Sequence, residues 1–310
     1  MKTEYESFVV AVRQQVEELA RGQLKVIEVC MDKNNGVVHR GLMLRDTHSN
    51  MAPTVYLEDL YREFRRGRSL YEISTDVLEI YRKAAKNTDF DVEYFKDFSQ
   101  IKEHIVYRLV NREKNQVLLG ECPYVSFLDL AVVPYVSIAV DREKNGAILI
   151  KKEHLRMWNV EEEELFAIAT KNTPRQLNAS IVKLEDTLKQ LITTVSTEDR
   201  ENFSEFIREL EESEEKIPMY VLSNQMNLYG AACMVYEDVV EMFAQGLGED
   251  VYILPSSVHE VLIVPVSKAL PPKDMLEMVR DINATQIPPE EVLSDHIYQF
   301  SLQQRGFRVL

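Results

Sequence analysis

The stretch from residue 217 to residue 266 constrains the fold most strongly, because short apolar runs and one helical pattern follow each other with few residues between them. Apolar runs at 220–222 and 231–236 flank a polar turn at 224–227. This arrangement is typical of a β-hairpin with a longer loop. We therefore expect the stretch to begin with two paired strands.

A helix and two more strands are expected in the second half of the same stretch. Glu237 and Asp238 favour a helix start, and Gly248 is suited to a left-handed cap at the helix end. Apolar residues recur between them at helical spacing, namely Val239, Val240, Phe243 and Leu247. β-Branched and aliphatic runs at 251–254 and 261–264 predict strands. The predicted unit is β-β-α-β-β, and the predicted class is α+β with antiparallel or mixed sheets built from β-β-α units and flanking helices.

A weaker copy of the first half of this unit lies upstream. Val133-Pro134 and Gly146-Ala147 repeat the spacing of Ile217-Pro218 and Gly230-Ala231, each at an offset of 84 residues. The copy predicts strands at 135–140 and 147–150 and a helix at about 160–171, with Asn159 as its N-cap. Either a duplication or the shared physics of β-β-α units can produce such a match.

The N-terminal third reads as a helical-rich α+β region. Residues 8–19 form a helical stripe closed by Gly22, and runs at 24–31 and 37–44 flank a glycine-containing loop typical of a hairpin. Further helices are expected at the positions 57–66, 69–85 and about 98–111, before a strand-like stretch through Leu119. This pattern predicts a region 1–120 and a C-terminal β-β-α repeat region 121–310, with a helical insertion at about 176–216.

The predicted insertion is the most acidic part of the chain. Residues 181–195 and 203–210 each trace one helical face, which predicts two amphipathic helices. Residues 198–215 include nine acidic and two basic side chains, a local charge of −7. A solvated outer face is the common outcome of such a run. The alternative is a docking surface for a basic protein partner, carried by Glu209, Glu211, Glu212, Glu214 and Glu215.

Composition excludes several function classes. The net charge of −15 disfavours nucleic-acid binding, which depends on clustered Lys and Arg. The cysteines, Cys30, Cys122 and Cys233, lack the spacing of a zinc site or a disulfide framework and read as buried apolar residues. The first ten residues lack an apolar h-region, and no apolar run approaches the roughly 18 residues of a membrane span. We expect a cytoplasmic protein with no membrane contact.

One local group of residues has the side-chain types needed for nucleophilic hydrolysis. Ser256, Ser257, His259 and Glu260 supply hydroxyl, imidazole and carboxylate groups. No G-x-S-x-G elbow surrounds the serines, and alternate residues of an extended segment face opposite sides. The alternative is a structural role, in which the serine hydroxyls form hydrogen bonds within a turn and the histidine binds a nearby backbone group.

Other candidate sites are less specific. The remaining histidines are scattered, so no metal or cofactor site is predicted, although His48 and Asp46 could share a ligand set with a distant group. A basic cluster lies on and just after the predicted helix at 57–66 and comprises Arg62, Arg65, Arg66 and Arg68; it suits either phosphate or RNA binding or intramolecular ion pairs. A third group is polar residues at element junctions that favour turns and caps, namely Asn50, Pro53, Asn172 and Asn224.

Several longer phrases resemble a known family. They are RDTHSNMAPTVYLEDLYREFRRGRSLYEI at 45–73, FAIATKNTP at 166–174, and YVLSN, YGAACMVY and YILPSSVHEVLIVP between residues 220 and 265. Together they are similar to the domain-of-unknown-function family number 5688 of gut clostridia. The resemblance implies no activity, cofactor or catalytic residue, and it suggests a bacterial gene associated with mobile elements.

These observations favour a non-catalytic cytoplasmic interaction or regulatory protein without a cofactor. The alternative is a hydrolase that uses Ser257, His259 and Glu260 together with Ser256. A deep pocket with converging polar groups favours catalysis, whereas a broad surface favours protein binding.

Overall fold

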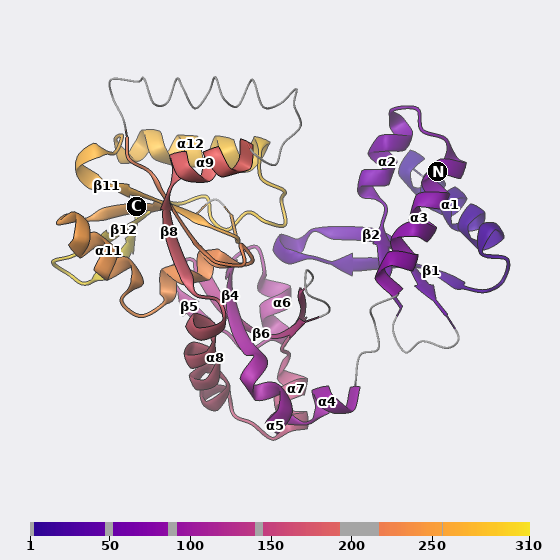
Figure 1. The fold of residues 1–310 in the computed structure, drawn as a ribbon, viewed down its shortest axis with the longest axis horizontal. Helices are drawn as coiled ribbons and strands as arrows, with labels where there is room; N and C mark the ends of the chain where they lie inside the picture. Colours follow the sequence, from indigo (N-terminus) through magenta and orange to yellow (C-terminus); the bar gives the residue numbers. More distant parts are fainter. Residues whose placement is uncertain (1–2, 47–51, 86–91, 140–144, 193–216, 256) are drawn as a thin grey trace. The chain divides into compact units, whose positions relative to one another are not determined.

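The chain has an α+β fold with three antiparallel sheets in the part that the structure describes (Figure 1). A computed structural model describes residues 3–46, 52–85, 92–139, 145–192, 217–255 and 257–310. These residues form two compact units, each described by itself below. Unit 1 contains residues 1–100 and 138–146, and unit 2 contains residues 101–137 and 147–310.

Unit 1 packs helices against a three-stranded sheet of order β1-β2-β3. Its elements are α1 (Glu4–Ala20), β1 (Lys25–Asp32), η1 (Asn34–Gly36), β2 (Val38–Arg45), β3 (Thr54–Tyr56), α2 (Glu58–Arg65) and α3 (Leu70–Ala85). The core joins Val12 and Val16 of α1, Leu42 and Leu44 of β2, and Ile73 of α3. The helix stripe, the hairpin and the helices predicted at 57–66 and 69–85 are confirmed.

Local capping explains where two of these helices begin. Thr3 caps α1 through a reciprocal capping box with Glu6. Ser69 and Glu72 form a second box before α3, because the Ser69 N–H donates to Glu72 at 2.9 Å and the Glu72 N–H donates to Ser69 Oγ at 3.3 Å. Each box satisfies backbone donors that the first helical turn leaves without partners.

A connecting segment and a small sheet open the following part of the chain. The elements are α4 (Val92–Lys96), α5 (Phe98–Ile101), η2 (Lys102–His104), β4 (Ile105–Asn111), α6 (Gln116–Glu121), β5 (Val125–Phe127), β6 (Leu130–Ala139), β7 (Asn145–Leu149), α7 (Lys152–Trp158) and α8 (Glu162–Gln176). β6 pairs with β4, β5 and β7. α8 packs along β4, where Thr173 Oγ1 accepts the Tyr107 N–H at 3.1 Å. The helix thereby covers the outer edge of β4.

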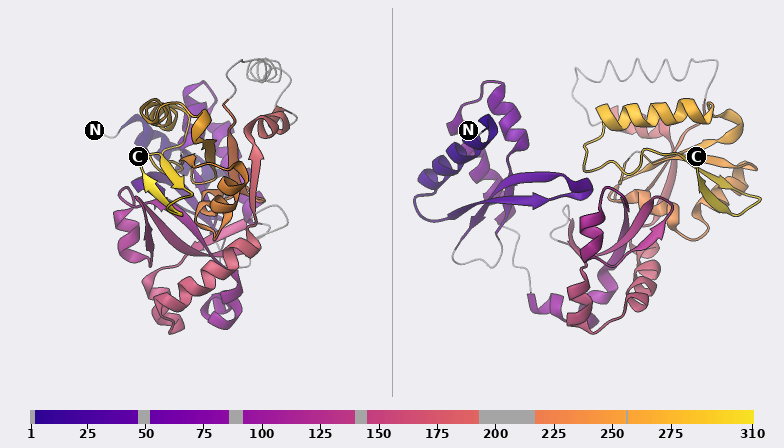
Figure 2. Two further views of the ribbon diagram at one scale, coloured as in Figure 1. Left: turned by 90° about the vertical axis from the view of Figure 1, so that its left-hand side faces the viewer. Right: turned by 180° about the vertical axis from the view of Figure 1, so that it is seen from behind.

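The larger sheet of unit 2 has the order β13-β12-β10-β11-β9-β8. Its elements are β8 (Ala179–Lys183), α9 (Leu184–Ile192), β9 (Tyr220–Asn224), η3 (Gly230–Val235), α11 (Val239–Leu247), β10 (Val251–Leu254), β11 (Val261–Pro265), η4 (Val266–Lys268), α12 (Pro272–Thr285), β12 (Tyr298–Ser301) and β13 (Gly306–Val309). α12 covers one face through Met275 and Val279 (Figure 2). α11 covers the opposite face, where Phe243 packs edge-on against Tyr220 of β9. The predicted helix with its Gly248 cap and the predicted strands at 251–254 and 261–264 are confirmed.

Three predicted elements are wrong. Residues 105–111 form strand β4 instead of a helix, and residues 116–121 form helix α6 instead of a strand. Residues 230–235 form the 3-10 helix η3 instead of the second hairpin strand. β9 pairs with β11 and β8 instead, so its partners are distant in sequence.

The upstream copy and the acidic insertion also fold differently from the prediction. Gly146-Ala147 lies in strand β7, whereas Gly230-Ala231 lies in η3, so the matched dipeptides have different structures. Asn159 ends α7 in a left-handed conformation, and Glu161 is the N-cap of α8. Residues 179–183 are strand rather than helix, and residues 193–216, which include the five glutamates from Glu209 to Glu215, lie outside the described residues.

Two features of the surface bear on the sequence expectations. Cys122 and Cys233 are buried, but Cys30 is exposed, contrary to the prediction. Cys30 lies in β1, and the one buried residue of that strand is Val26, near its beginning. The part of β1 that carries Cys30 is therefore not covered. Within the described residues, we find no helix with the length and apolar character needed to cross a bilayer.

We expect the protein to lose stability as the pH rises above about 10, the ordinary pKa of tyrosine. Burial raises the pKa of four tyrosines of unit 2, namely Tyr107, Tyr135, Tyr236 and Tyr298. Above that pH the unfolded chain releases protons that the folded chain retains, so unfolding becomes more favourable. Urea unfolding midpoints should begin to fall above about pH 8.5, because burial also raises the pKa of the Cys122 and Cys233 thiols, and should fall more steeply above about pH 10. A midpoint that is unchanged at higher pH would contradict the expectation.

Candidate functional site

The segment Ser257 to Glu260 lies in unit 2 between β10 and β11, and it is held by backbone and side-chain bonds. Ser257 is buried and forms an antiparallel bridge with Val292. Its Oγ accepts the backbone N–H of His259 at 3.0 Å. The serine hydroxyl therefore stabilises the local turn, and Ser256 lies outside the described residues.

His259 is fixed by contacts on both sides of its ring. Its Nδ1 accepts the backbone N–H of Tyr229 at 3.2 Å, which places the proton of the neutral ring on Nε2. Nε2 lies 3.8 Å from Glu291 Oε1, and the ring stacks on Tyr229 with centroids 5.6 Å apart. The His259 carbonyl accepts the Ser223 hydroxyl at 2.8 Å. The imidazole is thus tied to the loop before η3.

Glu260 completes this group of predicted residues. Burial raises the pKa of its carboxyl, and the nearby Glu291 carboxylate raises it further, while His259 and a hydrogen bond from Ser257 act in the opposite direction. The structure therefore brings Ser257, His259 and Glu260 together. It does not pair the Ser257 hydroxyl with the acceptor nitrogen of His259, because the Tyr229 N–H occupies that nitrogen.

Two of the predicted junction residues act as caps. Asn224 Oδ1 accepts the backbone N–H of Met226 at 3.0 Å, and its Nδ2 donates to the Leu228 carbonyl at 2.8 Å. Asn172 Nδ2 donates to the carbonyls of Lys102 and Ile105 at 2.8 and 3.1 Å. These bonds agree with the turn-and-cap interpretation.

Arg108 adjoins this group and was not anticipated. It lies in the middle of β4, and its guanidinium carbon is 4.8 Å from the centre of the Tyr229 ring. Tyr135 packs edge-on against the same ring at 5.6 Å. The helix predicted at 98–111 hid this position, whereas an apolar strand with one arginine, VYRLV, would have marked it.

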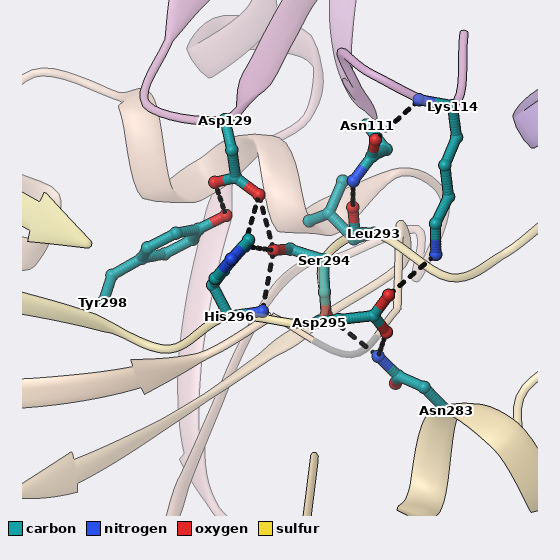
Figure 3. Close-up of polar contacts among 9 residues, drawn as sticks. All are labelled: Asn111, Lys114, Asp129, Asn283, Leu293, Ser294, Asp295, His296 and Tyr298. Atoms are coloured by element: carbon teal, nitrogen blue, oxygen red, sulfur yellow. Dashed lines mark hydrogen bonds and ion pairs between the residues drawn. The ribbon is translucent and has the colours of Figure 1, made fainter. Parts of the chain in front are cut away.

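A second polar cluster surrounds Asp129 at the turn between β5 and β6 (Figure 3). Asp129 Oδ2 accepts the Ser294 hydroxyl at 2.6 Å and lies 3.2 Å from His296 Nδ1, while Oδ1 accepts the Tyr298 hydroxyl at 2.6 Å. The preceding residue, Leu128, has φ of 56°, which is uncommon for a leucine. The turn is held in this form while three side chains bind one carboxylate.

Neighbouring bonds extend this cluster, which we call the Asp129 cluster, across unit 2. Asn111 Nδ2 donates to the Leu293 carbonyl at 3.0 Å, and Lys114 Nζ donates to Asp295 at 2.9 Å (Figure 3). Asn283 Nδ2 donates to Asp295 and to the Ser294 carbonyl, both at 2.9 Å. Despite partial burial, the hydrogen bonds from Asn283 and Lys114 lower the pKa of Asp295. The cluster joins the small sheet to the C-terminal segment.

The Asp129 cluster contains an oriented imidazole but not a serine nucleophile. The His296 side chain is 45% exposed, whereas Ser294 is fully buried; its hydroxyl donates to Asp129 at 2.6 Å and lies 3.4 Å from His296 Nδ1. A nucleophilic serine would have to donate to the histidine. His296 was among the scattered histidines in the sequence, and no local pattern connects it with Asp129.

Unit 1 presents a different candidate surface, the open edge of β1. β1 pairs only with β2 in the three-stranded sheet. The Lys33 N–H donates to the Val37 carbonyl at 2.7 Å, and the Leu44 N–H donates away from β1 to Pro53 at 3.1 Å. Because antiparallel bonds alternate, the outward N–H and C=O groups of β1 belong to one set of residues. The residues of this open edge are Val26, Glu28, Cys30 and Asp32.

The remaining sequence candidates are placed as follows. Arg65 pairs with Glu4 at 2.6 Å, Arg68 pairs with Asp76 at 2.7 Å, and Arg62 pairs with Asp59, in agreement with intramolecular ion pairs. Among the described residues, no group of three or more His, Cys, Asp or Glu side chains is arranged to hold a metal ion. Asn50 and His48 lie outside those residues.

Comparison with known proteins identifies a family without identifying an activity. No curated protein and no solved structure matches the chain. The model of a family of unknown function, DUF5688, matches residues 5–302. This match covers both units and nearly the whole chain, and the chain therefore belongs to DUF5688, a family of unknown function.

Proposed function

We propose that this chain is a non-catalytic interaction or regulatory protein that binds an extended, basic segment of a protein partner along the open edge of β1. The proposal includes a cytoplasmic location, suggested by composition, and an association with mobile elements, suggested by the family resemblance. The observation that carries it is the row of outward-pointing backbone N–H and C=O groups along the eight-residue strand β1, which pair with no second strand among the described residues.

An open edge of this length is unusual in a folded protein, because it is a template for another strand. The edge strands of the six-stranded sheet are shorter, with five residues in β8 and four in β13. The edge of β4 is covered by α8. Adding a strand to β1 would satisfy the outward groups of the open edge.

The charge of the edge favours a basic partner. Glu28 and Asp32 both belong to the outward-facing set, and both are exposed; Glu28 also pairs with Arg40 of β2 at 3.8 Å, so a basic partner would compete with that exposed ion pair. The chain as a whole has a net charge of −15, which attracts a basic segment at long range. The same charge disfavours nucleic acid as the partner.

A proline at the edge tests the proposal. Cys30→Pro removes one outward N–H without removing a bond to β2, and edge strands tolerate proline. Peptides selected from a random display library on the wild-type protein should be rich in Lys and Arg and should bind the variant at least tenfold more weakly. Bound peptide should also slow amide exchange at Glu28 and Cys30, while Ile27 and Val29, already bonded to β2, should change little.

Val38→Pro is the matched control, because Val38 is exposed on the same hairpin but its N–H points away from β1. The preceding residue, Val37, has ψ of 136°, which suits a following proline. Peptides that bind Cys30→Pro as tightly as wild type would contradict the proposal. So would dimerisation of the wild-type chain that Cys30→Pro abolishes, because a second copy would then be the occupant.

The hydrolase alternative stays a prediction, and one observation favours it. The raised pKa of Glu260 is the property expected of a general acid. Catalysis by the segment from Ser257 would require His259 to release the Tyr229 N–H, since that bond occupies its acceptor nitrogen.

A further inference from the structure

Arg108 is a cation placed among apolar side chains. The other six residues of β4 are buried. Alternate residues share a face of a strand, so Arg108 lies between Val106 and Val110 on one face of the sheet. Val106 belongs to an apolar cluster with Tyr135 and Leu177, and Val110 belongs to another with the remaining members Leu119, Cys122, Ala131 and Val133.

One guanidinium nitrogen lacks, among the described residues, the acceptor that such a position requires. This nitrogen is Nε, which is buried. Among the described residues, Arg108 also takes part in no ion pair. Its contact with Tyr229 is a cation–π interaction, which offsets charge but supplies no acceptor in the plane of the guanidinium. A buried donor without an acceptor destabilises the folded chain.

We propose that Arg108 is the anchor of a binding site for an oxyanion group, a carboxylate or a phosphate, that presents two oxygens to the guanidinium. Planar guanidinium groups bind such anions through two parallel hydrogen bonds. Arg108 is partly exposed, so an anion can reach it from solvent. The Tyr229 ring packs against the guanidinium, and Tyr135 supports that ring by packing edge-on against it.

The site is connected to the segment from Ser257 to Glu260 through Tyr229. The Tyr229 ring contacts both Arg108 and His259, and its N–H donates to His259 Nδ1. Tyr229 itself has a left-handed backbone with φ of 53°, which is uncommon for a tyrosine. An anion on Arg108 would therefore lie beside the loop before η3.

Arg108→Met tests the proposal, because methionine replaces the apolar stem and removes the charge. In wild-type protein, phosphate or acetate at constant ionic strength should raise the Tm by roughly 5 °C at one hundred times the Kd. The response to the two salts separates a phosphate ligand from a carboxylate ligand. Arg108→Met should lose this response and should be at least as stable as wild type without the anion, because it removes a partly buried cation whose buried Nε has no acceptor among the described residues.

Arg112→Met is the matched control, since Arg112 is exposed and binds Ser126. It should retain the wild-type response, which separates specific binding from the general stabilising effect of phosphate. Arg108→Lys keeps the charge without the fork, and it should bind the anion at least tenfold more weakly. An equal response in wild type and Arg108→Met, or no response of wild type to either anion, would overturn the proposal.

Discussion

Gly230→Ala should lower the stability of unit 2 by about 3 kcal/mol, the upper range for overpacking a close contact. A Cβ at this position would lie 2.1 Å from Ser223 Oγ, 2.5 Å from the His259 carbonyl oxygen and 2.7 Å from the Asn224 nitrogen. Two of these atoms belong to the backbone and cannot rotate away. The hydrogen bond from Ser223 to His259 would also be lost. Urea unfolding, followed through the fluorescence of Trp158, the single tryptophan, measures the change.

Gly246→Ala provides a control with the opposite expected sign. Gly246 is helical in α11, and a Cβ there would meet no atom within 4 Å. Alanine should stabilise the helix by about 0.5 kcal/mol because it favours helical backbone more than glycine does. Equal unfolding midpoints for the two variants would contradict the expectation that close contacts at position 230 exclude a Cβ atom.

Asp129→Ala should cost about 3 to 4 kcal/mol, because it removes the acceptor for two buried hydroxyls and one imidazole. Ser294 and Tyr298 are fully buried, so water cannot replace the carboxylate without rearrangement. Asp129→Asn keeps one oxygen and should cost about half as much. Burial and Asp129 raise the pKa of Tyr298, so the alanine variant should also show earlier tyrosine ionisation.

Asp295→Asn is the control for charge removal in the same cluster. Asp295 is 41% exposed and binds Lys114 and Asn283. An exposed ion pair contributes about 0 to 1 kcal/mol, so this variant should unfold close to the wild-type midpoint. Equal losses of unfolding free energy in Asp129→Ala and Asp295→Asn would contradict the argument that the buried hydroxyls bound to Asp129 make its loss more costly.

Periodicity predicted the elements whose packing is local. The stripe in α1 and the apolar runs of β10 and β11 each carry enough pattern to specify their structure. The strand at 105–111 was misread because it is covered on both faces. A doubly buried strand is a continuous apolar run, which periodicity alone does not distinguish from a helix.

Pairing across long sequence separations explains the other errors. Residues 179–183 are strand because β9 pairs with them, although their spacing also fits a helix. The run GAACMV folds as η3 because Gly230 packs closely against Ser223 and His259, which leaves no extended strand there. Neither constraint is visible in the residues themselves.

The candidate site was predictable only in part. Ser257, His259 and Glu260 are adjacent in sequence, so their association followed from local reading. Arg108 could have been predicted as a site residue only if residues 105–111 had been assigned as a strand. The Asp129 cluster could not be predicted from the sequence, because Ser294 and Asp129 are separated by 165 residues and no local pattern encodes such a contact.

The same separation has a consequence for synthesis on the ribosome. Asp129 emerges 165 residues before Ser294, and Asn111 emerges 182 residues before Leu293. At a synthesis rate of about 5 to 20 residues per second, roughly ten to thirty seconds pass between the synthesis of the β5–β6 turn and that of the residues that donate hydrogen bonds to Asp129. During that interval the small sheet lacks the segment whose side chains bind Asp129, so nascent chains of unit 2 should be sensitive to proteases and should engage chaperones until the last strands are made.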